Sequence, residues 1–584
     1  MRNLLILNTE ESIKINPNFD AVLDLNNKGK NFIAFEDLLD KNTNSRIYKQ
    51  VRNFSKTWYK PFEKELTYDG ISLPSLIEMN LLNFWPVFLK FDVLSKFLIK
   101  KSPKKIHLIT NNEEDIRIIN EIIKNKKIEF SFKLLKRKEK KKIEFKKSFY
   151  SLIARFQNLL ANIYLKRKHK KKNILFLGNV RQTLPLLKKL KENKENVILR
   201  TGENLGKGTF VGYCDYYLTF KTERPSKRIK IIMHKKFDNF INEKGFNENV
   251  YFNILKNNFK HIFLEDFPKL ISYINKLRKI HKKIDVIVTH NDILPFEKSL
   301  ILTANKLSIP TLTMIEGFLP SKQISKDNLF IPFNADNIAL FSQSQKDIII
   351  KKYKIHKDKL NVVGYPLFDQ YYSKPALKKE EIYSRYNIPL DKKIVIFTAE
   401  RYDKNKFKGS IWGAFTQKQC EVVYEELFNA FKSFPELFLI VKKHPSGSLD
   451  NEIINKIAKK LNFNNYVISK DMDIHNLLNA SYAIITRLSN MGLEAMLLGK
   501  YVIILDTHFD SNDNFNYTDF NASLHAKKPG ELNKLLNKLL TDKNLQKKLK
   551  NNIKKFVKYH YSVNDGNSSE RMAKLIEDTS RKNL

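Results

Sequence analysis

The chain has 584 residues and a formal net charge of +43, and 42% of its residues are hydrophobic. A length several times that of a usual domain predicts two or three domains, and the hydrophobic content argues against a disordered protein. The two cysteines, Cys214 and Cys420, lie far apart, which excludes a disulfide framework and is consistent with a reducing cytoplasm. No run reaches the ~18–20 apolar residues that cross a bilayer, so we expect a cytoplasmic protein, soluble or peripheral on the inner face of the cell membrane.

The positive charge could indicate nucleic acid, anionic lipid or an acidic substrate as a partner. Lysine is, however, spread along the whole chain together with abundant asparagine and isoleucine, a composition that an AT-rich genome produces without selection for any partner. No nucleic-acid-reading module is recognisable, and we therefore expect no specific nucleic acid as a partner.

The first 132 residues predict an N-terminal α/β region. Short apolar runs at residues 4–7 and 106–109 are candidate strands, and mostly helical patterns lie between them. Nothing in this region indicates a particular chemistry.

Residues 133–172 form a basic amphipathic segment. Lysine and arginine concentrate in residues 136–142 and 166–172, on either side of a predicted helix. One helical stripe contains the apolar residues Phe145, Phe149, Leu152, Ile153, Phe156, Leu160, Ile163 and Tyr164. Such a helix can lie on an anionic membrane surface, to which each nearby basic residue contributes up to ~1 kcal/mol. Alternatively, the stripe packs on the protein core and the lysines are solvated.

Two further α/β domains follow, the first spanning residues 173–370. Its candidate strands are residues 173–178, 197–199, 286–289 and 311–315. The polar segment 371–392, which contains Pro375 and Pro389, is the expected linker. In residues 393–584 strands and helices alternate again, and this alternation is typical of a parallel sheet covered by helices.

A candidate catalytic base follows one strand of the middle domain. His290 and Asp292 come directly after the predicted strand 286–289, on the side where an acceptor would bind. The carboxylate could hold the histidine pKa near neutrality, and a histidine with such a pKa can remove a proton from an acceptor hydroxyl. Alternatively, His290 is a loop residue that makes a structural hydrogen bond.

The C-terminal domain contains the most informative segment of the chain. The apolar run 438–441 has the length and β-branched content of a buried parallel strand, and it ends just before His444. A second run, 483–485, is followed by Ser489, which can cap a helix that starts at Asn490. Exposed amides at such a helix start favour a phosphate group by about 1 kcal/mol.

Neighbouring residues fit a nucleotide-sugar as the ligand. Gly492 lets a ligand approach the helix closely, and Glu494 lies on the same helix, where its carboxylate can accept hydrogen bonds from a ribose or sugar diol. We expect His444 to form a hydrogen bond to the donor phosphate or leaving group, with Arg401 and Lys442 as further sources of positive charge.

The order of these motifs resembles a known group of enzymes. His444-Pro445, the pattern Ser-x-x-Gly-x-Glu-Ala-x-x-x-Gly-Lys of residues 489–500 and the β-branched run after it are similar to the C-terminal half of GT-B glycosyltransferases, especially bacterial surface-polysaccharide (capsule-type) transferases. The non-hydrolysing UDP-N-acetylglucosamine 2-epimerases share this pattern and fold. Other segments that resemble these proteins are residues 362–369, 394–401 and 565–571. The resemblance, which covers roughly residues 280–580, implies two Rossmann-like domains that face each other across a cleft.

The chain departs from these families at two places. Epimerases carry a histidine-arginine pair where this chain has Glu400-Arg401, which makes epimerase activity less favoured. Many capsule and teichoic-acid enzymes carry His-Gly where this chain has Glu316-Gly317. If a catalytic base occupies that place, it is the Glu316 carboxylate.

Other chemistries lack their sequence signatures. The glycine cluster at residues 201–209 has the wrong spacing for a phosphate-binding P-loop, and no Gly-x-Gly-x-x-Gly follows a strand, as a dehydrogenase would require. Asp471 and Asp473 precede a helix and are expected to cap it rather than to bind a metal–nucleotide complex. We therefore expect no metal site, and no cofactor besides the donor substrate.

The favoured function is a metal-independent glycosyltransferase of cell-envelope biosynthesis, which moves a sugar from a nucleotide-sugar to a surface glycan or lipid-linked acceptor. In this reaction Glu316 or His290 deprotonates the acceptor, and the residues around His444 stabilise the departing nucleoside phosphate. The alternatives are a teichoic-acid-type phosphotransferase that uses a CDP-alcohol and releases CMP, an epimerase-like enzyme, and a non-enzymatic basic protein that binds nucleic acid or a membrane surface.

Overall fold

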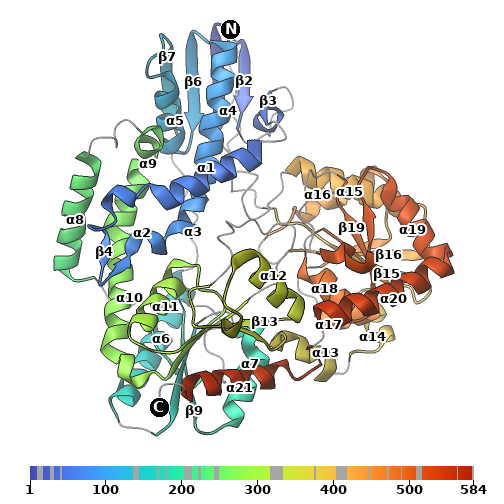
Figure 1. The fold of residues 1–584 in the computed structure, drawn as a ribbon. Coiled ribbons are helices and arrows are strands. Elements are labelled where there is room, and N and C mark those ends of the chain that lie inside the picture. The colour runs from blue at the N-terminus through green and yellow to red at the C-terminus, as the bar shows by residue number, and fades with distance from the viewer. Residues whose placement is uncertain are drawn as a thin grey trace.

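The computed structural model describes residues 1–581 apart from 9–17, 26–31, 40–42, 136–143, 168–169, 178–179, 203–213, 221–224, 243–248, 316–332, 374–375, 403–416, 445–446, 470–472, 488, 508–515, 562 and 564. The described residues form three parallel β-sheets accompanied by helices (Figure 1). The N-terminal sheet is at the top of Figure 1, and the C-terminal sheet is on the right. The predicted class, two Rossmann-like domains and an additional N-terminal α/β region, is confirmed.

The N-terminal sheet has five parallel strands in the order β3-β2-β1-β6-β7. They are β1 (Asn3–Asn8), β2 (Ala21–Asp24), β3 (Ile33–Ala34), β6 (Lys105–Thr110) and β7 (Glu129–Leu134). The helices of this region are α1 (Thr43–Thr57), α2 (Leu73–Leu76), α3 (Glu78–Leu81), α4 (Trp85–Lys101) and α5 (Glu113–Ile123). A short antiparallel hairpin, β4 (Thr67–Tyr68) and β5 (Ile71–Ser72), precedes α2. The strands predicted near residues 4–7 and 106–109 are therefore confirmed.

A buried ion pair lies at the carboxyl edge of this sheet. The Nζ atom of Lys90 in α4 lies 2.6 Å from Oδ1 of Asp115 in α5, and both side chains are buried. The hydroxyl of Thr110, the last residue of β6, donates to Oδ2 of Asp115 (2.7 Å). These bonds join two helices to the end of a strand, so the pair is part of the packing of this region.

The middle sheet has seven parallel strands in the order β10-β9-β8-β11-β12-β13-β14. They are β8 (Lys172–Leu177), β9 (Asn196–Thr201), β10 (Tyr216–Tyr217), β11 (Val286–Thr289), β12 (Thr311–Met314), β13 (Asn337–Leu340) and β14 (Leu360–Val362). The helices between them are α7 (Val180–Glu192), α8 (Lys227–Asn242), α9 (Val250–His261), α10 (Phe267–Ile280), α11 (Pro295–Lys306) and α12 (Gln343–Tyr353). Helix α6 (Glu144–Lys166) precedes β8 and contacts β10.

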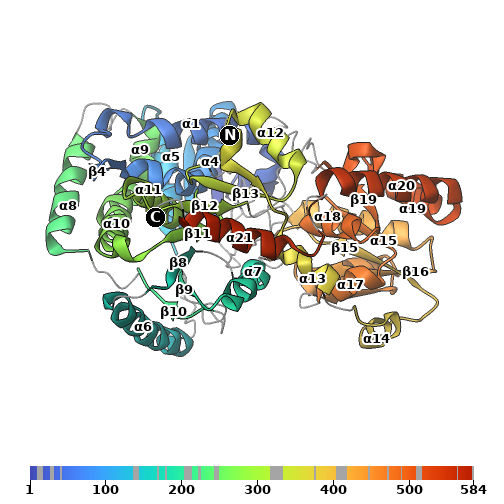
Figure 2. The same cartoon turned by 60° about the horizontal axis from the view of Figure 1, so that its bottom comes forward.

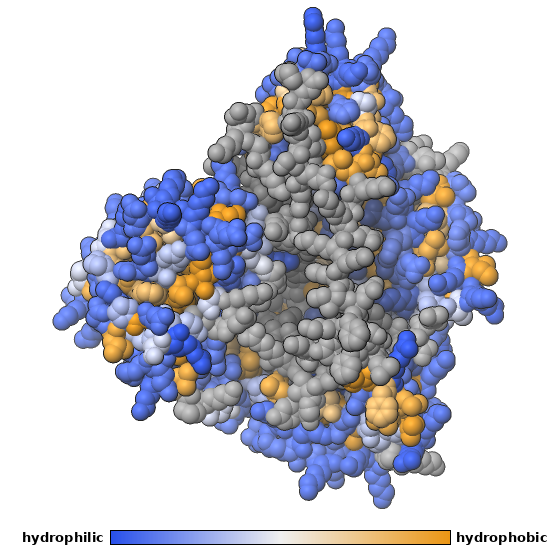
Figure 3. All heavy atoms as spheres, turned by 180° about the vertical axis from the view of Figure 1, so that it is seen from behind, coloured by the Kyte–Doolittle hydropathy of each residue, from blue (hydrophilic) through white to orange (hydrophobic). Residues whose placement is uncertain are grey.

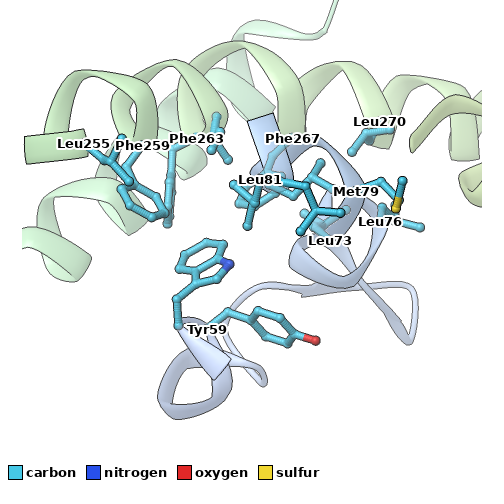
Figure 4. Packing of buried hydrophobic residues seen from close by; sticks show 14 of the residues in the cluster. Tyr59, Leu73, Leu76, Met79, Leu81, Leu255, Phe259, Phe263, Phe267 and Leu270 are labelled. Carbon is cyan, nitrogen blue, oxygen red and sulfur yellow. The ribbon is translucent and has the colours of Figure 1, made fainter. Parts of the chain in front are cut away.

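The N-terminal region and the middle domain share one hydrophobic core. Helices α9 and α10 are joined by a π-helical turn, Ile262–Asp266, and they pack against the segment around α2 and α3 (Figure 4). The ring centroids of Trp58 and Phe259 lie 4.8 Å apart in this contact. The same buried cluster contains strand residues of both sheets, such as Leu4 and Leu175. The N-terminal region is therefore packed as part of the same body as the middle domain.

The C-terminal sheet has six parallel strands in the order β17-β16-β15-β18-β19-β20. They are β15 (Lys393–Thr398), β16 (Leu437–Lys442), β17 (Tyr466–Ser469), β18 (Ala483–Thr486), β19 (Tyr501–Leu505) and β20 (Leu524–Ala526). The helices that accompany them are α15 (Gln417–Phe431), α16 (Asn451–Lys460), α17 (Ile474–Ala480), α18 (Asn490–Leu497), α19 (Glu531–Thr541) and α20 (Lys543–His560). Two short helices, α13 (Gln370–Ser373) and α14 (Lys379–Arg385), lie between the middle and the C-terminal sheets in sequence.

The last helix, α21 (Ser568–Arg581), returns to the middle domain, although the sequence analysis assigned it to the C-terminal domain (Figure 2). Its Ile576 is buried in a cluster with strand residues of the middle sheet. The Asp369 carboxylate accepts hydrogen bonds from the backbone amides of Ser568 (3.0 Å) and Ser569 (2.7 Å) at the start of the helix. Asp369 therefore caps α21 and joins the two chain segments that connect the domains.

Candidate active site

The candidate site lies at the carboxyl edge of the C-terminal sheet, where the strand order reverses. From β15 the chain continues to β16 and β17 on one side of the sheet, and it later forms β18, β19 and β20 on the other side. The ends of β15 and β18 are tied by a buried hydrogen bond of 2.7 Å between the hydroxyls of Thr398 and Thr486. In open parallel sheets, ligands bind beyond the strand ends at such a switch point. Residues that directly follow β15 and β18 are therefore the first candidates for ligand contacts.

His444 lies two residues beyond the end of β16, as the sequence predicts. Its backbone N–H donates to the hydroxyl of Ser448 (2.6 Å), which fixes the turn that follows the strand. Partial burial, together with the positive charges of Arg401 and Lys442, lowers the pKa of His444 below its usual value. The imidazole is therefore neutral at pH 7, and a bound anion would raise its pKa again.

Arg401 is brought next to His444 by a contact between two loops. The backbone N–H of Tyr402 donates to the carbonyl of Gly447 (3.2 Å), and the N–H of Gly447 donates to the carbonyl of His444 (3.1 Å). Gly447 has a φ of +130°, and a Cβ atom there would lie 2.7 Å from the carbonyl oxygen of Tyr402, so the contact requires glycine. Within the part of the chain that the structure describes, Nε of Arg401 is buried and has no hydrogen-bond partner.

An unpartnered buried guanidinium donor is uncommon, because it costs free energy unless an acceptor satisfies it. A ligand atom that accepts a hydrogen bond here must also suit the neighbouring side chains of Lys442 and His444, which are cationic or neutral hydrogen-bond donors like Arg401. Lys442 is buried at the end of β16, and its Nζ donates to the carbonyl of Lys443 (3.4 Å). Phosphate oxygens meet these requirements, because they are anionic and accept several hydrogen bonds at once.

Helix α18 begins beside this cluster and is capped as predicted. The hydroxyl of Ser489 accepts a hydrogen bond from the N–H of Met491 (3.3 Å), and Thr486 accepts one from the N–H of Ser489 (3.3 Å). Asn490 is exposed at the first turn. The positive end of the helix therefore points out of the same sheet edge that carries His444.

The surroundings of Gly492 differ from what the sequence analysis expects. A Cβ atom at this position would lie 2.9 Å from a methyl carbon of Thr486 and 3.0 Å from the ring of Tyr517. The space that was assigned to an approaching ligand is filled by protein atoms, so packing explains the glycine. Glu494 is buried, and one of its carboxylate oxygens accepts a hydrogen bond from the hydroxyl of Tyr371 in α13. In this arrangement Glu494 connects α18 to α13, in the segment between the domains.

Four charged or titratable residues of this sheet edge were missed as site residues by the sequence analysis. Nε of Arg487, directly after β18, lies 3.3 Å from Oδ1 of Asp506, directly after β19, and both side chains are buried. The Nε2 atom of His525 lies 3.7 Å from Oδ2 of Asp506. Burial raises the pKa of Glu400 to about 7, with Arg487 opposing and Asp506 reinforcing the shift. A signal was available for Arg487 and Asp506, because each directly follows a strand, whereas His525 lies inside β20 (Leu524–Ala526).

The histidine predicted to act on the acceptor, His290, lies at the end of the predicted strand, but its environment differs from the expectation. His290 follows β11 and is only 2% exposed; burial lowers its pKa to about 4, with a contribution from Arg200. The carboxylate of Asp292 accepts hydrogen bonds from the backbone amides of Asn334 (2.6 Å) and Ala335 (2.9 Å). The prediction that Asp292 holds the pKa of His290 near neutrality is therefore wrong, since desolvation dominates.

Two sequence interpretations fall on positions that the structure does not describe. Glu316 lies outside the described residues, as does most of the glycine cluster 201–209. Of the predicted capping pair, Asp473 is described: its carboxylate accepts a hydrogen bond from the N–H of His475 (3.0 Å) and caps α17. Among the described residues, no group of three or more histidine, cysteine, aspartate and glutamate side chains is arranged to hold a metal ion.

Comparison with known proteins gives a family match over the C-terminal part of the chain. Residues 328–578 match the family described as CDP-Glycerol:Poly(glycerophosphate) glycerophosphotransferase. A teichoic acid poly(ribitol-phosphate) polymerase of Bacillus spizizenii is 23% identical over 245 residues, which are 42% of this chain and 37% of that protein. The chain therefore matches little more than a third of the length of this relative.

Solved structures with related folds include enzymes of two kinds. The UDP-GlcNAc 2-epimerase of Neisseria meningitidis bound to UDP-GlcNAc is 15% identical, with a TM-score of 0.46 over 70% of this chain and 100% of that one. A variant of the wall teichoic acid polymerase TagF soaked with CDPG is 14% identical, with a TM-score of 0.43 over 76% and 99% of the two chains. Because both TM-scores are below 0.5, we assign the fold from the strand order of the sheets and not from these structures.

The family match changes the ranking of the predicted functions. It contains Arg401, Lys442, His444 and Ser489, whereas His290 and Glu316 lie before it. The match favours the phosphotransferase that the sequence analysis gave as an alternative over the favoured sugar transferase, and it gives no support to an epimerase reaction.

Proposed function

We propose that the chain transfers an alditol phosphate from a CDP-alcohol, such as CDP-glycerol, to a lipid-linked cell-envelope polymer and releases CMP. The observation that carries this proposal is the cationic cluster of Arg401, Lys442 and His444 at the switch point of the C-terminal sheet, beside the start of α18. The family match over residues 328–578 supports a CDP-alcohol as the donor class. A cytoplasmic location is part of the proposal, because a nucleotide donor is required.

The bond changes explain why such a cluster is useful. The acceptor hydroxyl oxygen bonds to the phosphorus that carries the alditol, and the bond between this phosphorus and the bridging oxygen breaks. The hydroxyl proton passes to a base, and the bridging oxygen leaves as part of CMP with additional negative charge. Positive side chains that are already in place stabilise this charge without reorganisation, and phosphoryl transfer depends mainly on such positioning and electrostatics.

The roles of the individual residues follow from their environments. Arg401 has a free Nε–H donor among the described residues and is proposed to bind a donor phosphate oxygen, while Lys442 adds positive charge at the same place. His444, neutral at pH 7, donates a ring N–H to the phosphate or to the leaving group. These side chains supply the charge that a metal ion supplies in other transferases, and we propose that the reaction requires neither a metal nor a cofactor.

The acceptor hydroxyl also needs a base, for which the sequence offers Glu316 and His290. His290 is neutral at pH 7, as a base must be, but its ring is almost completely buried. Glu316 is therefore the proposed base. In sequence it directly follows the run that ends at Ile315, in the part of the chain that we assign to the acceptor.

The donor class can be tested by ligand-dependent stabilisation. CDP, CMP and CDP-glycerol should raise the melting temperature, and UDP, UDP-GlcNAc, GDP and ADP should not; a ligand at about 100 times its Kd stabilises a protein by about 2.7 kcal/mol. Arg401→Ala should abolish most of the shift, whereas Arg385→Ala, an exposed arginine of α14, should keep it. Stabilisation by uridine nucleotides alone would instead support the sugar transferase, and equal shifts in both variants would show that the site is elsewhere.

A further inference from the structure

Helix α6 and strand β7 both expose apolar side chains. In α6, Tyr164 is buried and its hydroxyl donates to Oδ1 of Asn173 in β8 (2.9 Å), whereas Phe156 and Ile163 are 59% and 43% exposed. The single stripe that the sequence predicts, with Phe156, Ile163 and Tyr164 on one side, is therefore wrong. Strand β7 differs from α6, because its exposed apolar side chains lie on a strand whose outer edge pairs with no other described strand.

Strand β7 is the last strand on one side of the N-terminal sheet. Its residues Phe132 and Leu134 are 51% and 45% exposed. Figure 1 shows this strand on the side of the N-terminal sheet away from the C-terminal domain. In Figure 3, apolar side chains are visible among hydrophilic ones on the N-terminal part of the molecule, at the top of the view. An exposed apolar strand edge is a template for pairing with another strand, so β7 has the properties of an interface strand.

The hydrogen bonds to the neighbouring strand β6 fix which backbone groups of β7 point outward. The N–H of Glu129 donates to the carbonyl of Lys104 (2.9 Å), and the N–H of Leu135 donates to the carbonyl of Thr110 (2.8 Å). Successive residues of a strand direct their backbone groups alternately to its two sides. The residues whose N–H and C=O groups point away from β6 are therefore Phe130, Phe132 and Leu134.

The sequence of β7, together with the residue before it, is self-complementary when two copies run antiparallel. It reads Ile128-Glu-Phe-Ser-Phe-Lys-Leu134. With Ser131 opposite Ser131 of a second copy, the other opposite pairs are Ile128 with Leu134, Glu129 with Lys133, and Phe130 with Phe132. Every apolar residue then meets an apolar residue, and every charged residue meets the opposite charge. Cross-strand pairs of these two kinds stabilise a sheet.

The backbone direction and the charges select the same register. Opposite residues of an antiparallel pair must both point outward or both point inward, so the register can change only in steps of two residues. One such step places Lys133 opposite Lys127, and the step in the other direction places Glu129 opposite Leu135. Like charges directly opposite each other destabilise a strand pair. The register centred on Ser131 is therefore favoured over both neighbouring registers.

We propose that the chain forms a twofold-symmetric dimer in which β7 of one copy pairs antiparallel with β7 of a second copy. The rings of Phe130 and Phe132, which lie 5.9 Å apart within one chain, pack with the same rings of the second copy. The Glu129 carboxylate, which forms an ion pair with Lys105 of its own chain, also accepts a hydrogen bond from Lys133 of the second copy. The two five-stranded sheets become one continuous sheet.

Ser131 suits the position on the twofold axis. The two residues there do not exchange hydrogen bonds, so their Cα atoms approach to about 4.5 Å and leave room for small side chains. The hydroxyl of Ser131 lies 2.8 Å from Nδ1 of His107 in β6, which holds it on its own sheet. The strand at the other edge of the sheet, β3, has only two residues, so pairing through β7 ends with two copies.

The dimer does not depend on the proposed reaction. Strand β7 lies before the segment 328–578 that the family match covers, and it contains none of the nucleotide-site residues. The pairing therefore gives the N-terminal sheet a role in assembly, whatever donor the C-terminal sheet binds.

The mass of the full chain in solution tests the proposal, measured by size-exclusion chromatography with light scattering over a dilution series. We expect the wild type to have twice the mass of one chain. Lys133→Glu and Glu129→Lys each place like charges opposite each other at two symmetric positions, and each should weaken dimerisation at least about tenfold. The double variant E129K/K133E restores opposite charges and should dimerise like the wild type. Lys547→Glu, at an exposed lysine of α20, is the matched control and should remain a dimer.

A backbone variant tests the strand pairing independently of charge. Phe132→Pro removes an N–H that points outward and keeps the hydrogen bonds to β6, as proline does at the outer side of an edge strand. We expect a monomer with the melting temperature of the Lys133→Glu monomer.

Three results would overturn the proposal. A wild type that is monomeric at every concentration would show that β7 does not pair. A dimer that survives both Lys133→Glu and Phe132→Pro would place the interface elsewhere on the chain. If both single charge variants are monomers and E129K/K133E is also a monomer, the two residues do not face each other, and the antiparallel register centred on Ser131 is wrong.

Discussion

Replacing Gly447 by alanine perturbs the candidate site without removing any functional side chain. The residue has a φ of +130°, a region that is essentially restricted to glycine, and an added Cβ atom would lie 2.7 Å from the backbone oxygen of Tyr402. Neither atom can rotate away, because the Cβ position is fixed by the backbone of residue 447 and the oxygen belongs to the backbone of Tyr402. Strain of this kind costs of order 1–3 kcal/mol, which the variant can relieve only by separating the loop of Arg401 from the loop of His444. We therefore expect Gly447→Ala to lower stability by that amount and to lose most of the binding of a cytidine diphosphate.

Urea unfolding and thermal shifts with CDP measure these two effects separately. The matched control is Gly499→Ala, which changes a glycine of the same domain with a φ of +69° and no atom within 4 Å of the added Cβ. This control should also lose about 1 kcal/mol, the cost of a left-handed conformation, but it should bind CDP like the wild type. If Gly447→Ala binds CDP as tightly as Gly499→Ala does, the junction between the two loops does not form the site, and the reasoning fails.

Four further outcomes are expected. His444→Ala should fold normally and reduce turnover about 100-fold, as measured by CMP release. Excess EDTA should change the rate of the wild type by less than about twofold; loss of activity with rescue by Mg²⁺ would contradict the electrostatic role given to the side chains. Because the folded pKa of Glu400 is raised to about 7, the folded state binds more protons than the unfolded state, and stability falls as pH rises from about 4.5 to about 7. Glu400→Gln should remove up to about 3 kcal/mol of that decrease in urea titrations at pH 5 and pH 8. Asp115→Asn should cost about 3–5 kcal/mol, because it leaves Lys90 charged and buried; an unchanged urea midpoint would argue against the ion pair.

The sequence could predict where strands end, and this placed much of the candidate site. Short β-branched runs followed by polar residues identify parallel strands, and the carboxyl ends of such strands gather at one edge of a sheet. His444 and Ser489 were located in this way, and the structure brings the segments that contain them to the same edge. Arg401 was proposed from its place after a strand, but its unpartnered donor depends on the loop around Gly447, which is distant in sequence.

The properties that the sequence could not predict depend on contacts between distant segments. Gly492 was interpreted as a ligand contact, but the space beside it is filled by Tyr517, which comes 25 residues later in the sequence. The pKa of His290 follows from the depth of its burial and not from the adjacent Asp292. For α6, helical spacing identifies which residues share a side, but a helix with apolar residues on two sides needs the position of the sheet to show which side is packed.

The identity of the nucleotide released during turnover tests the proposed function most directly. Transfer of an alditol phosphate from a CDP-alcohol breaks the bond between the phosphorus that carries the alditol and the bridging oxygen, and it must release CMP. Transfer of a sugar from a nucleoside diphosphate sugar breaks a carbon–oxygen bond and releases a nucleoside diphosphate. With CDP-glycerol and a lipid-linked acceptor, we expect CMP to form in proportion to the acceptor consumed, and Arg401→Ala to form it much more slowly. Release of a nucleoside diphosphate from a nucleotide-sugar, with no CMP from CDP-glycerol, would contradict the proposal.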